Sequence, residues 1–267
     1  MYKLGWFSTG RGSGSRALLT KMHDEIEKGN VKANIEFVFC SREPGDAEGS
    51  DKFIELVKSY RLPLVCLSSK RFKTDAGEYL SPAWRLEYDR EAMKRLKAYS
   101  PDLCVLAGYM LIVGPEMCQH YKMINLHPAA PGGPKGTWQE VIWQLIESKA
   151  AETGVMMHLV TPELDEGPPV TYCKFSLRGK LFDKHWEEIK GLSVKEIRAK
   201  QGEENPLFKL IRQEGLKREL PLVVTTVKAF SEGRVRIERG QIIDSKGRVV
   251  KGYSLTREID KLVGAFN

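Results

Sequence analysis

The stretch YKLGWFSTGRGSGSR, residues 2–16, joins an apolar run to a loop of small residues and then to an amphipathic segment. Residues 2–8 have the length and apolar character of a buried strand, and the residues from 13 onward open a helix. A strand that passes through a glycine-rich turn straight into a helix is typical of the first βα unit of a parallel sheet.

The glycines and serines make this loop a candidate anion site. Glycine permits positive φ, and small residues let an anion approach the exposed N–H groups at a helix N-terminus. The serines are also expected to cap the helix. The alternative is a tight βα turn with an N-cap and no ligand. We expect the loop to bind a substrate phosphate through Gly10, Arg11, Gly12, Ser13, Gly14 and Ser15.

The end of the second predicted strand distinguishes a phosphate from a dinucleotide. The loop spacing is not GxGxxG, and Cys40, Ser41 and Arg42 stand where a dinucleotide-binding chain carries an acidic ligand for the ribose. The sequence therefore favours phosphate binding.

Apolar runs alternate with amphipathic stretches over the first 130 residues. This alternation is typical of repeated βα units, and it predicts an α/β fold with an open, mostly parallel twisted sheet and flanking helices. Such crossovers are right-handed and place ligands at the carboxyl ends of the strands. The predicted strands span residues 2–8, 34–40, 63–67, 103–107 and 123–126, and the predicted helices span 13–28, 50–60 and 84–99.

Residues beyond 130 show fewer regular patterns. Residues 180–215 are charged and helix-leaning, without a clear site. A short C-terminal helix is expected to precede a β-hairpin that turns at Arg239 and Gly240. The predicted elements are a helix at 138–148, strands at 154–160 and 170–175, a helix at 221–231 and hairpin strands at 235–238 and 241–244.

Asn125 and His127 lie two residues apart at the end of a predicted strand, just before Pro128. Strand alternation places both side chains on one face. An amide there can hydrogen-bond a developing oxyanion, and a histidine can exchange a proton near physiological pH. The alternative is a structural histidine next to a turn.

Asp165 lies in the loop 161–169, between two predicted strands. Acidic residues in such loops usually face solvent or cap a backbone N–H. Asp165 becomes a candidate catalytic residue if it faces His127, where it could orient the imidazole and stabilise its protonated form.

Charge and composition limit the class of protein. The net charge is +7, with basic residues mixed among acids along the chain, so small anionic substrates are favoured over a nucleic-acid surface. No run approaches eighteen apolar residues, so we expect no membrane span, and the first residues lack the pattern of a secretory signal. Five cysteines without a CxxC pair favour a reducing, cytoplasmic location over disulfides or zinc. The oligomeric state is open, and a homodimer is one alternative.

Several motifs in order resemble the folate-dependent formyltransferase family. They are the loop after residue 8, PDLCVLAGYM at 101–110, INLHP at 124–128, ELDEGP at 163–168, and LPLV at 220–223 followed by FSEG at 230–233. The resemblance runs almost end to end and is strongest to the branch that acts on glycinamide ribonucleotide in purine biosynthesis. It implies a Rossmann-like single domain over 1–267, with a phosphate-binding half at 1–130 and a folate-binding and catalytic half at 131–267.

The resemblance also implies an activity and a site. A formyl group would pass from 10-formyltetrahydrofolate, as co-substrate, to the amine of glycinamide ribonucleotide, with no metal and no covalent enzyme intermediate. Asn125, His127 and Asp165 would be catalytic. The folate pocket would be lined by Tyr109, Met110, Leu111, Ile112, Val113, Leu164, Glu166 and Gly167.

The chain departs from the family pattern in places that bear on the acceptor. The loop 129–136 is altered and shortened, Thr137 and Trp138 stand where a histidine is expected, and Leu111 and Leu216 replace an arginine and a glutamate. The acceptor could therefore be an amino sugar nucleotide or another small phosphorylated amine. A methionyl-tRNA formyltransferase usually carries a separate C-terminal domain, for which the tail looks too short. A hydrolase that releases formate and a non-catalytic phosphate- or nucleotide-binding protein are the remaining alternatives.

Overall fold

The computed structural model describes residues 1–265, and these form two compact units. The first unit comprises residues 1–125, 158–168 and 227–250, and the second comprises the others. The single-domain assignment over 1–267, with its halves at 1–130 and 131–267, stays a prediction.

The first unit is built on parallel strands in the order β5-β4-β1-β2-β3. Successive strands move outward from β1 to β3, and the chain then returns to place β4 on the other side of β1. The carboxyl ends of β1 and β4 therefore flank a switch in strand order, where open α/β sheets bind ligands. The strands are β1 Tyr2–Ser8, β2 Ala33–Cys40, β3 Leu64–Cys66, β4 Leu103–Leu106 and β5 Met123–His127.

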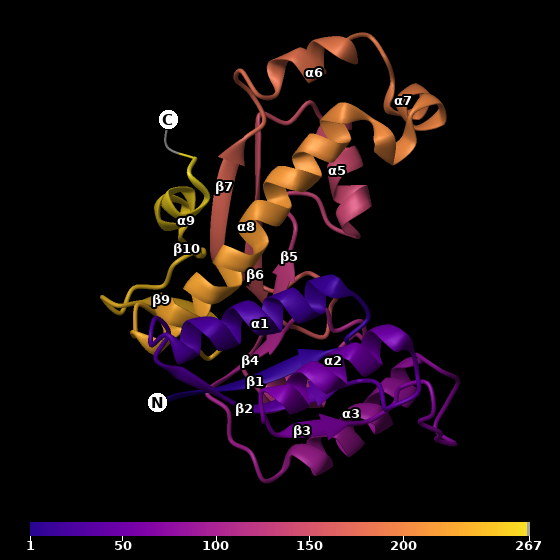
Figure 1. Ribbon diagram of the computed structural model, residues 1–267, viewed down its shortest axis with the longest axis vertical. Coiled ribbons are helices and arrows are strands. Elements are labelled where there is room, and N and C mark those ends of the chain that lie inside the picture. The colour runs from indigo at the N-terminus through magenta and orange to yellow at the C-terminus, as the bar shows by residue number, and fades with distance from the viewer. Residues whose placement is uncertain (266–267) are drawn as a thin grey trace. The chain divides into compact units, whose positions relative to one another are not determined.

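Helices cover this parallel sheet on both faces (Figure 1). Because the crossovers are right-handed, the outward steps place α1 and α2 on one face and the return places α3 and α4 on the other. Phe7, Phe37 and Phe39 pack with Trp84 and Tyr88 of α3 in one buried cluster. The helices are α1 Ser13–Glu27, α2 Glu48–Ser59, α3 Pro82–Leu96 and α4 Pro115–His120.

The predicted fold class is confirmed, including the C-terminal hairpin of β8 (Val235–Glu238) and β9 (Gln241–Asp244). Arg239 and Gly240 both have positive φ, 49° and 76°, as a two-residue hairpin turn of the primed type requires.

The second unit carries strands in the order β10-β7-β6 and a separate apolar cluster. The segment without a predicted role, 180–215, supplies Phe182, Ile189 and Ile197 to this cluster, so it is part of the packing of the unit. Capping boxes at Thr137 and Ser193 start two of its helices. Its elements are α5 Trp138–Glu147, β6 Glu152–Leu159, β7 Pro169–Ser176, α6 Asp183–Glu188, α7 Val194–Lys200, the 3-10 turn Gly202–Glu204, α8 Pro206–Ser231, β10 Tyr253–Ser254 and α9 Thr256–Val263. β5, β6 and α8 each continue from one unit into the other.

Two local expectations are wrong. The helix expected to start at Pro221 begins at Pro206, and Pro221 lies inside it. Proline favours a first helical turn, but burial of Leu222 and Val223 beyond it outweighs the loss of one backbone hydrogen bond. The expected serine cap of α1 is also not formed, because Gly12 occupies the N-cap position and no side chain accepts a capping hydrogen bond.

No helix within residues 1–265 is long and apolar enough to cross a membrane.

Candidate active site

The loop after β1 is held against the residues that follow β4. Thr9 N donates to Gly108 O at 3.0 Å, and Met110 N donates to Thr9 Oγ1 at 2.9 Å. Residues 11–14 remain exposed at the start of α1. Since α1 lacks a side-chain cap, the N–H groups of its first turn are suited to an anionic ligand.

A small cavity of about 60 Å³ opens beside the segment after β4. Apolar side chains form most of its wall, and three polar side chains, Asn125, His158 and Asp165, lie together in it. Pockets for drug-sized ligands usually hold about 300 Å³ or more. The cavity is smaller than this, and the exposed Leu164 lies in its wall. The wall is formed by Leu106, Tyr109, Leu111, Ile112, Val113, Asn125, His158, Val160, Thr161, Leu164 and Asp165.

The three polar side chains contact one another through His158. Its Nε2 atom lies 3.2 Å from Asn125 Nδ2 and 3.4 Å from Asp165 Oδ1. The side chain of His158 is only 3% exposed and that of Asp165 only 13%, so these contacts are shielded from water. The first unit thus brings together two of the predicted catalytic residues and a histidine that sequence analysis missed.

The hydrogen bonds of His158 indicate its tautomer. Nδ1 lies 3.0 Å from the carbonyl oxygen of Leu159, which can only accept. Nδ1 therefore carries the proton, and in the neutral ring Nε2 accepts from the Asn125 amide. This contact fixes the orientation of the Asn125 side chain and leaves its second N–H to donate elsewhere.

Asp165 has a backbone conformation that is uncommon outside glycine. Its φ is +56°, within a turn that Glu166 N closes on Glu163 O at 3.3 Å. The next glycine holds this turn close to β6, because a Cβ on Gly167 would lie 1.7 Å from the Leu159 carbonyl oxygen. The turn is thus fixed by a contact that only glycine permits.

His127 is 2% exposed, and its Nε2 lies 3.0 Å from the carbonyl oxygen of Pro134. Because a carbonyl can only accept, Nε2 donates this hydrogen bond. Pro134 belongs to the altered loop 129–136, so the part of the chain that departs from the family pattern supports the histidine. His127 lies in β5 with Asn125, as predicted.

The predicted folate-binding residues divide into two groups. Tyr109, Leu111, Ile112, Val113 and Leu164 line the cavity. Within residues 1–265, its wall does not include Met110, Glu166 or Gly167, and Met110 is 59% exposed. Burial above all raises the pKa of the Tyr109 phenol well above its ordinary value, so this phenol stays uncharged.

The signal for His158 was weak in the sequence. It follows three apolar residues, 155–157, in a predicted strand, where a histidine is usually a structural residue. Only the fold shows that the end of this strand lies beside Asn125 and the 161–167 turn.

Comparison with known proteins finds a matching family and several similar chains. The model of the formyl transferase family matches residues 11–177. Phosphoribosylglycinamide formyltransferase of Escherichia coli is 26% identical over 250 residues, covering 92% of this chain and 95% of the relative. The same enzyme of Haemophilus influenzae is 25% identical over 257 residues, with coverage of 95% and 99%.

A solved structure shares the fold. Glycinamide ribonucleotide transformylase 1 of Symbiobacterium toebii superposes with a TM-score of 0.63 at 22% identity, over 91% of this chain and 93% of the other. The matched family region includes residues 11–15 of the loop after β1, the cavity wall and the Asn125–His158–Asp165 cluster.

Proposed function

The chain belongs to the formyl transferase family, and from this we propose that it transfers a formyl group from 10-formyltetrahydrofolate to the amine of glycinamide ribonucleotide. The observation that carries the proposal is the buried Asn125–His158–Asp165 cluster in the wall of an otherwise apolar cavity. The names of the relatives from E. coli and H. influenzae support this acceptor. A cytoplasmic location, where purine precursors and reduced folates occur, accords with the five free cysteines.

In the proposed reaction, the acceptor amine attacks the formyl carbon directly. The carbonyl oxygen becomes a tetrahedral oxyanion, which the free N–H of the Asn125 amide stabilises. The bond between the formyl carbon and N10 of the folate then breaks, and the proton lost by the amine is delivered to N10. The products are the formylated amide and tetrahydrofolate.

His127 and Asp165 are proposed to assist the transfer of the proton from the acceptor amine to N10 of the folate. His127 in its protonated form stabilises the oxyanion. Asp165, which lies 3.4 Å from His158 Nε2, passes the proton toward N10, through water where needed. No step forms a bond between the enzyme and the formyl group.

The substrates are proposed to occupy the two sides of the residues after β4. The apolar wall made by Tyr109, Leu111 and Val113 suits a flat pteridine, and the loop 10–15 suits the phosphate of the acceptor.

An absorbance assay that follows loss of 10-formyl folate tests this function. Purified protein with glycinamide ribonucleotide should turn over, and His127→Ala should not. Loss of the formyl group without any acceptor would instead indicate hydrolysis to formate. Turnover only with a different phosphorylated amine would retain formyl transfer and reject the proposed acceptor.

A further inference from the structure

A second cavity lies in the first unit, at the carboxyl ends of β1, β2 and β3, and its volume is about 310 Å³. Three of its lining side chains are cations that come from three different strand ends: Arg11, Arg42 and Lys70. Within the described residues, no aspartate or glutamate lines it. The whole lining is Thr9, Arg11, Arg42, Ala47, Ser50, Lys70 and Met110.

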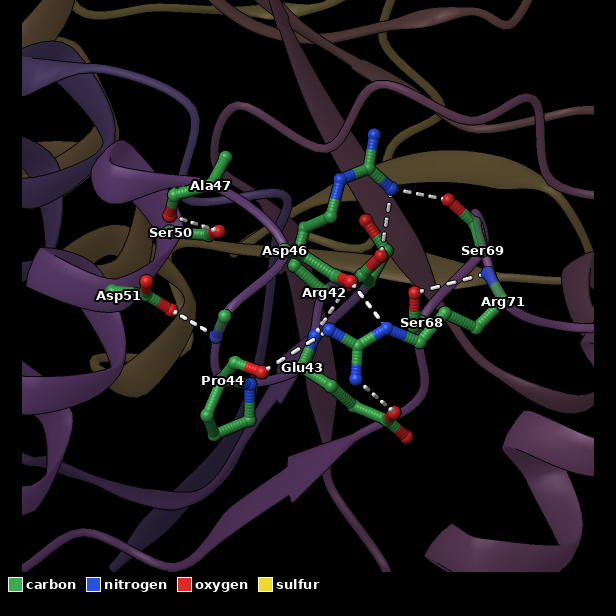
Figure 2. A network of polar contacts seen from close by, with 12 residues as sticks. Arg42, Glu43, Pro44, Asp46, Ala47, Ser50, Asp51, Ser68, Ser69 and Arg71 are labelled. Carbon is green, nitrogen blue, oxygen red and sulfur yellow. Dashed lines mark hydrogen bonds and ion pairs between the residues drawn. The ribbon is translucent and has the colours of Figure 1, made fainter.

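The acidic residues near this cavity are bound by a different cation. Arg71 Nε contacts Asp46 Oδ1 at 2.8 Å, and Arg71 Nη1 lies 3.8 Å from Glu43 (Figure 2). Burial raises the pKa of the Asp46 carboxyl. The hydrogen bonds from Glu43 N–H and Ser68 and the charges of Arg71 and Arg42 outweigh this effect, so the pKa is lowered. Asp46 is therefore an ionised partner for Arg71.

Arg42 is held in place through oxygens that carry no charge. Its Nη1 donates to the carbonyl oxygen of Ser41 at 2.9 Å. The same atom donates to the Ser69 hydroxyl (Figure 2). Within residues 1–265, neither Arg42 nor Arg11 nor Lys70 has a carboxylate within ion-pair distance. A positioned guanidinium with no carboxylate in ion-pair contact is suited to an anionic ligand.

The backbone around the cavity adds to this preference. Ala47 is the N-cap of α2 and has no side chain to accept the N–H groups of the first turn. A Cβ on Gly49 would lie 2.3 Å from the carbonyl oxygen of Arg11, so the loop after β1 packs against that same turn. The positive end of the α2 dipole thus lies beside the three cations.

We propose that Arg42 and Lys70, together with Arg11, bind a phosphoryl group in this cavity. A phosphoryl group offers three acceptor oxygens and nearly two negative charges, which suits three cations better than a carboxylate does. Arg42 and Lys70 lie outside the loop 10–15, so they are specificity residues additional to it. The phosphoryl group can be that of the acceptor, and in this case the inference rests on the proposed function. It can also be a second phosphoryl group, and in that case the inference does not rest on the proposed function.

Calorimetric titration of the whole protein with inorganic phosphate tests the proposal. Arg42→Gln and Lys70→Gln should each weaken phosphate binding about tenfold or more. Lys73→Gln is the matched control, because Lys73 is exposed and close in sequence but does not line the cavity, and its affinity should equal that of the wild type. Lys70 is exposed, so its variant keeps the fold even if the Arg42 variant does not. Equal affinity in all four proteins would overturn the proposal.

A competition experiment identifies the source of the phosphoryl group. If glycinamide ribonucleotide displaces phosphate in a manner that depends on Arg42, the cavity holds the phosphate of the acceptor. If both bind together, it holds a second phosphoryl group. If the wild-type protein does not transfer a formyl group but binds phosphate in a manner that depends on Arg42, the proposed function is rejected and the proposed phosphoryl site is retained. If Arg42→Gln and Lys70→Gln both keep the normal KM for the acceptor and the wild-type affinity for phosphate, the proposed phosphoryl site is rejected and the proposed function is not.

Discussion

The side chain of Asn125 is held by one neighbour and remains available for a second hydrogen bond. Its amide contacts His158 Nε2 at 3.2 Å, which uses one N–H and orients the other. Removal of one oxyanion donor typically costs about 10²–10³ in rate. We therefore expect Asn125→Ala to lower kcat by about 100-fold or more and to leave folate affinity within a few-fold of wild type.

The Asn125 variant is measured by steady-state kinetics and by folate titration. Asn30→Ala is the control, since Asn30 is an exposed residue whose side chain contacts Glu25 on the surface. A kcat for Asn125→Ala close to that of the control would show that this amide does not stabilise the oxyanion.

His158 is expected to act as a positioning residue for Asn125. It touches both Asn125 and Asp165, and its Nδ1 proton is held by Leu159 O. His158→Ala should lower kcat about tenfold or more, with smaller changes in KM, because the amide loses its fixed orientation. His158→Gln can restore a hydrogen bond to Asn125 and should recover part of the rate. No difference in kcat between the alanine and glutamine variants would contradict the positioning role.

At the scale of elements, the turn after β6 depends on one glycine. A Cβ on Gly167 would lie 1.7 Å from Leu159 O, a contact that the backbone relieves only by moving. Gly167→Ala should lower the Tm and weaken folate binding, because Asp165 and Leu164 belong to the same turn.

Gly215→Ala provides the opposite comparison. Gly215 lies within α8, and a Cβ there would meet nothing within 4 Å. This variant should keep folate affinity and gain up to about 1 kcal/mol of stability from helix propensity. If both glycine variants had the same Tm and folate affinity, the close approach at Gly167 would have no consequence.

The junction of α3 and α4 depends on a buried carboxyl. Asp89 is 2% exposed and accepts a hydrogen bond from Gly114 N at 2.6 Å. Burial is the largest cause that raises its pKa to about 7, while the Gly114 N–H and Arg85 oppose the increase. The folded protein therefore holds this proton more tightly than the unfolded chain does.

This shift makes stability depend on pH in a defined direction. The contribution of Asp89 to the free energy of unfolding is most favourable below the ordinary aspartate pKa. It is lost as pH rises toward 7, by at most roughly 4 kcal/mol. The free energy of unfolding, measured with urea, should differ less between pH 5 and pH 8 for Asp89→Asn than for wild type. The exposed Asp75→Asn should behave as wild type. An equal pH difference in all three proteins would contradict the shifted pKa.

Local sequence patterns predicted most elements of the first unit because each signal there is strong. The apolar run at 2–8 and the small-residue loop after it correspond to β1 and the start of α1. α4 was missed, since six residues carry too little periodicity to identify a helix. The start of α8 was misplaced because Pro221 resembles a first helical residue, whereas tertiary packing extends the helix on both sides of it.

For the whole molecule, the sequence predicted the strand ends at which the candidate site residues lie but not all the side chains that meet there. Asn125 and Asp165 were identified, and their link through His158 required the fold. Arg42 was noted only as a departure from dinucleotide binding, and its place beside Lys70 and Arg11 depends on the order of β1, β2 and β3. Long-range proximity of this kind has no local sequence signal.

The chain has a net charge of +7, and cations gather at one cavity of the first unit. Among residues 1–265, three cations and no acid line the 310 Å³ cavity, while other basic residues such as Arg71 and Arg90 are bound to carboxylates. If this cavity binds a phosphoryl group as proposed, we expect the attraction of a small phosphorylated substrate to weaken as ionic strength rises.

The central claim is transfer of the formyl group to glycinamide ribonucleotide, and a labelled single-turnover experiment tests it most directly. The protein is mixed with 10-formyl folate that carries ¹³C in the formyl group, together with the acceptor, and the label is followed by NMR. We expect the label to appear in the formylated amide of the acceptor, with wild-type protein and not with His127→Ala. Label that stays on a bound folate, or that is recovered as free formate, would contradict the account.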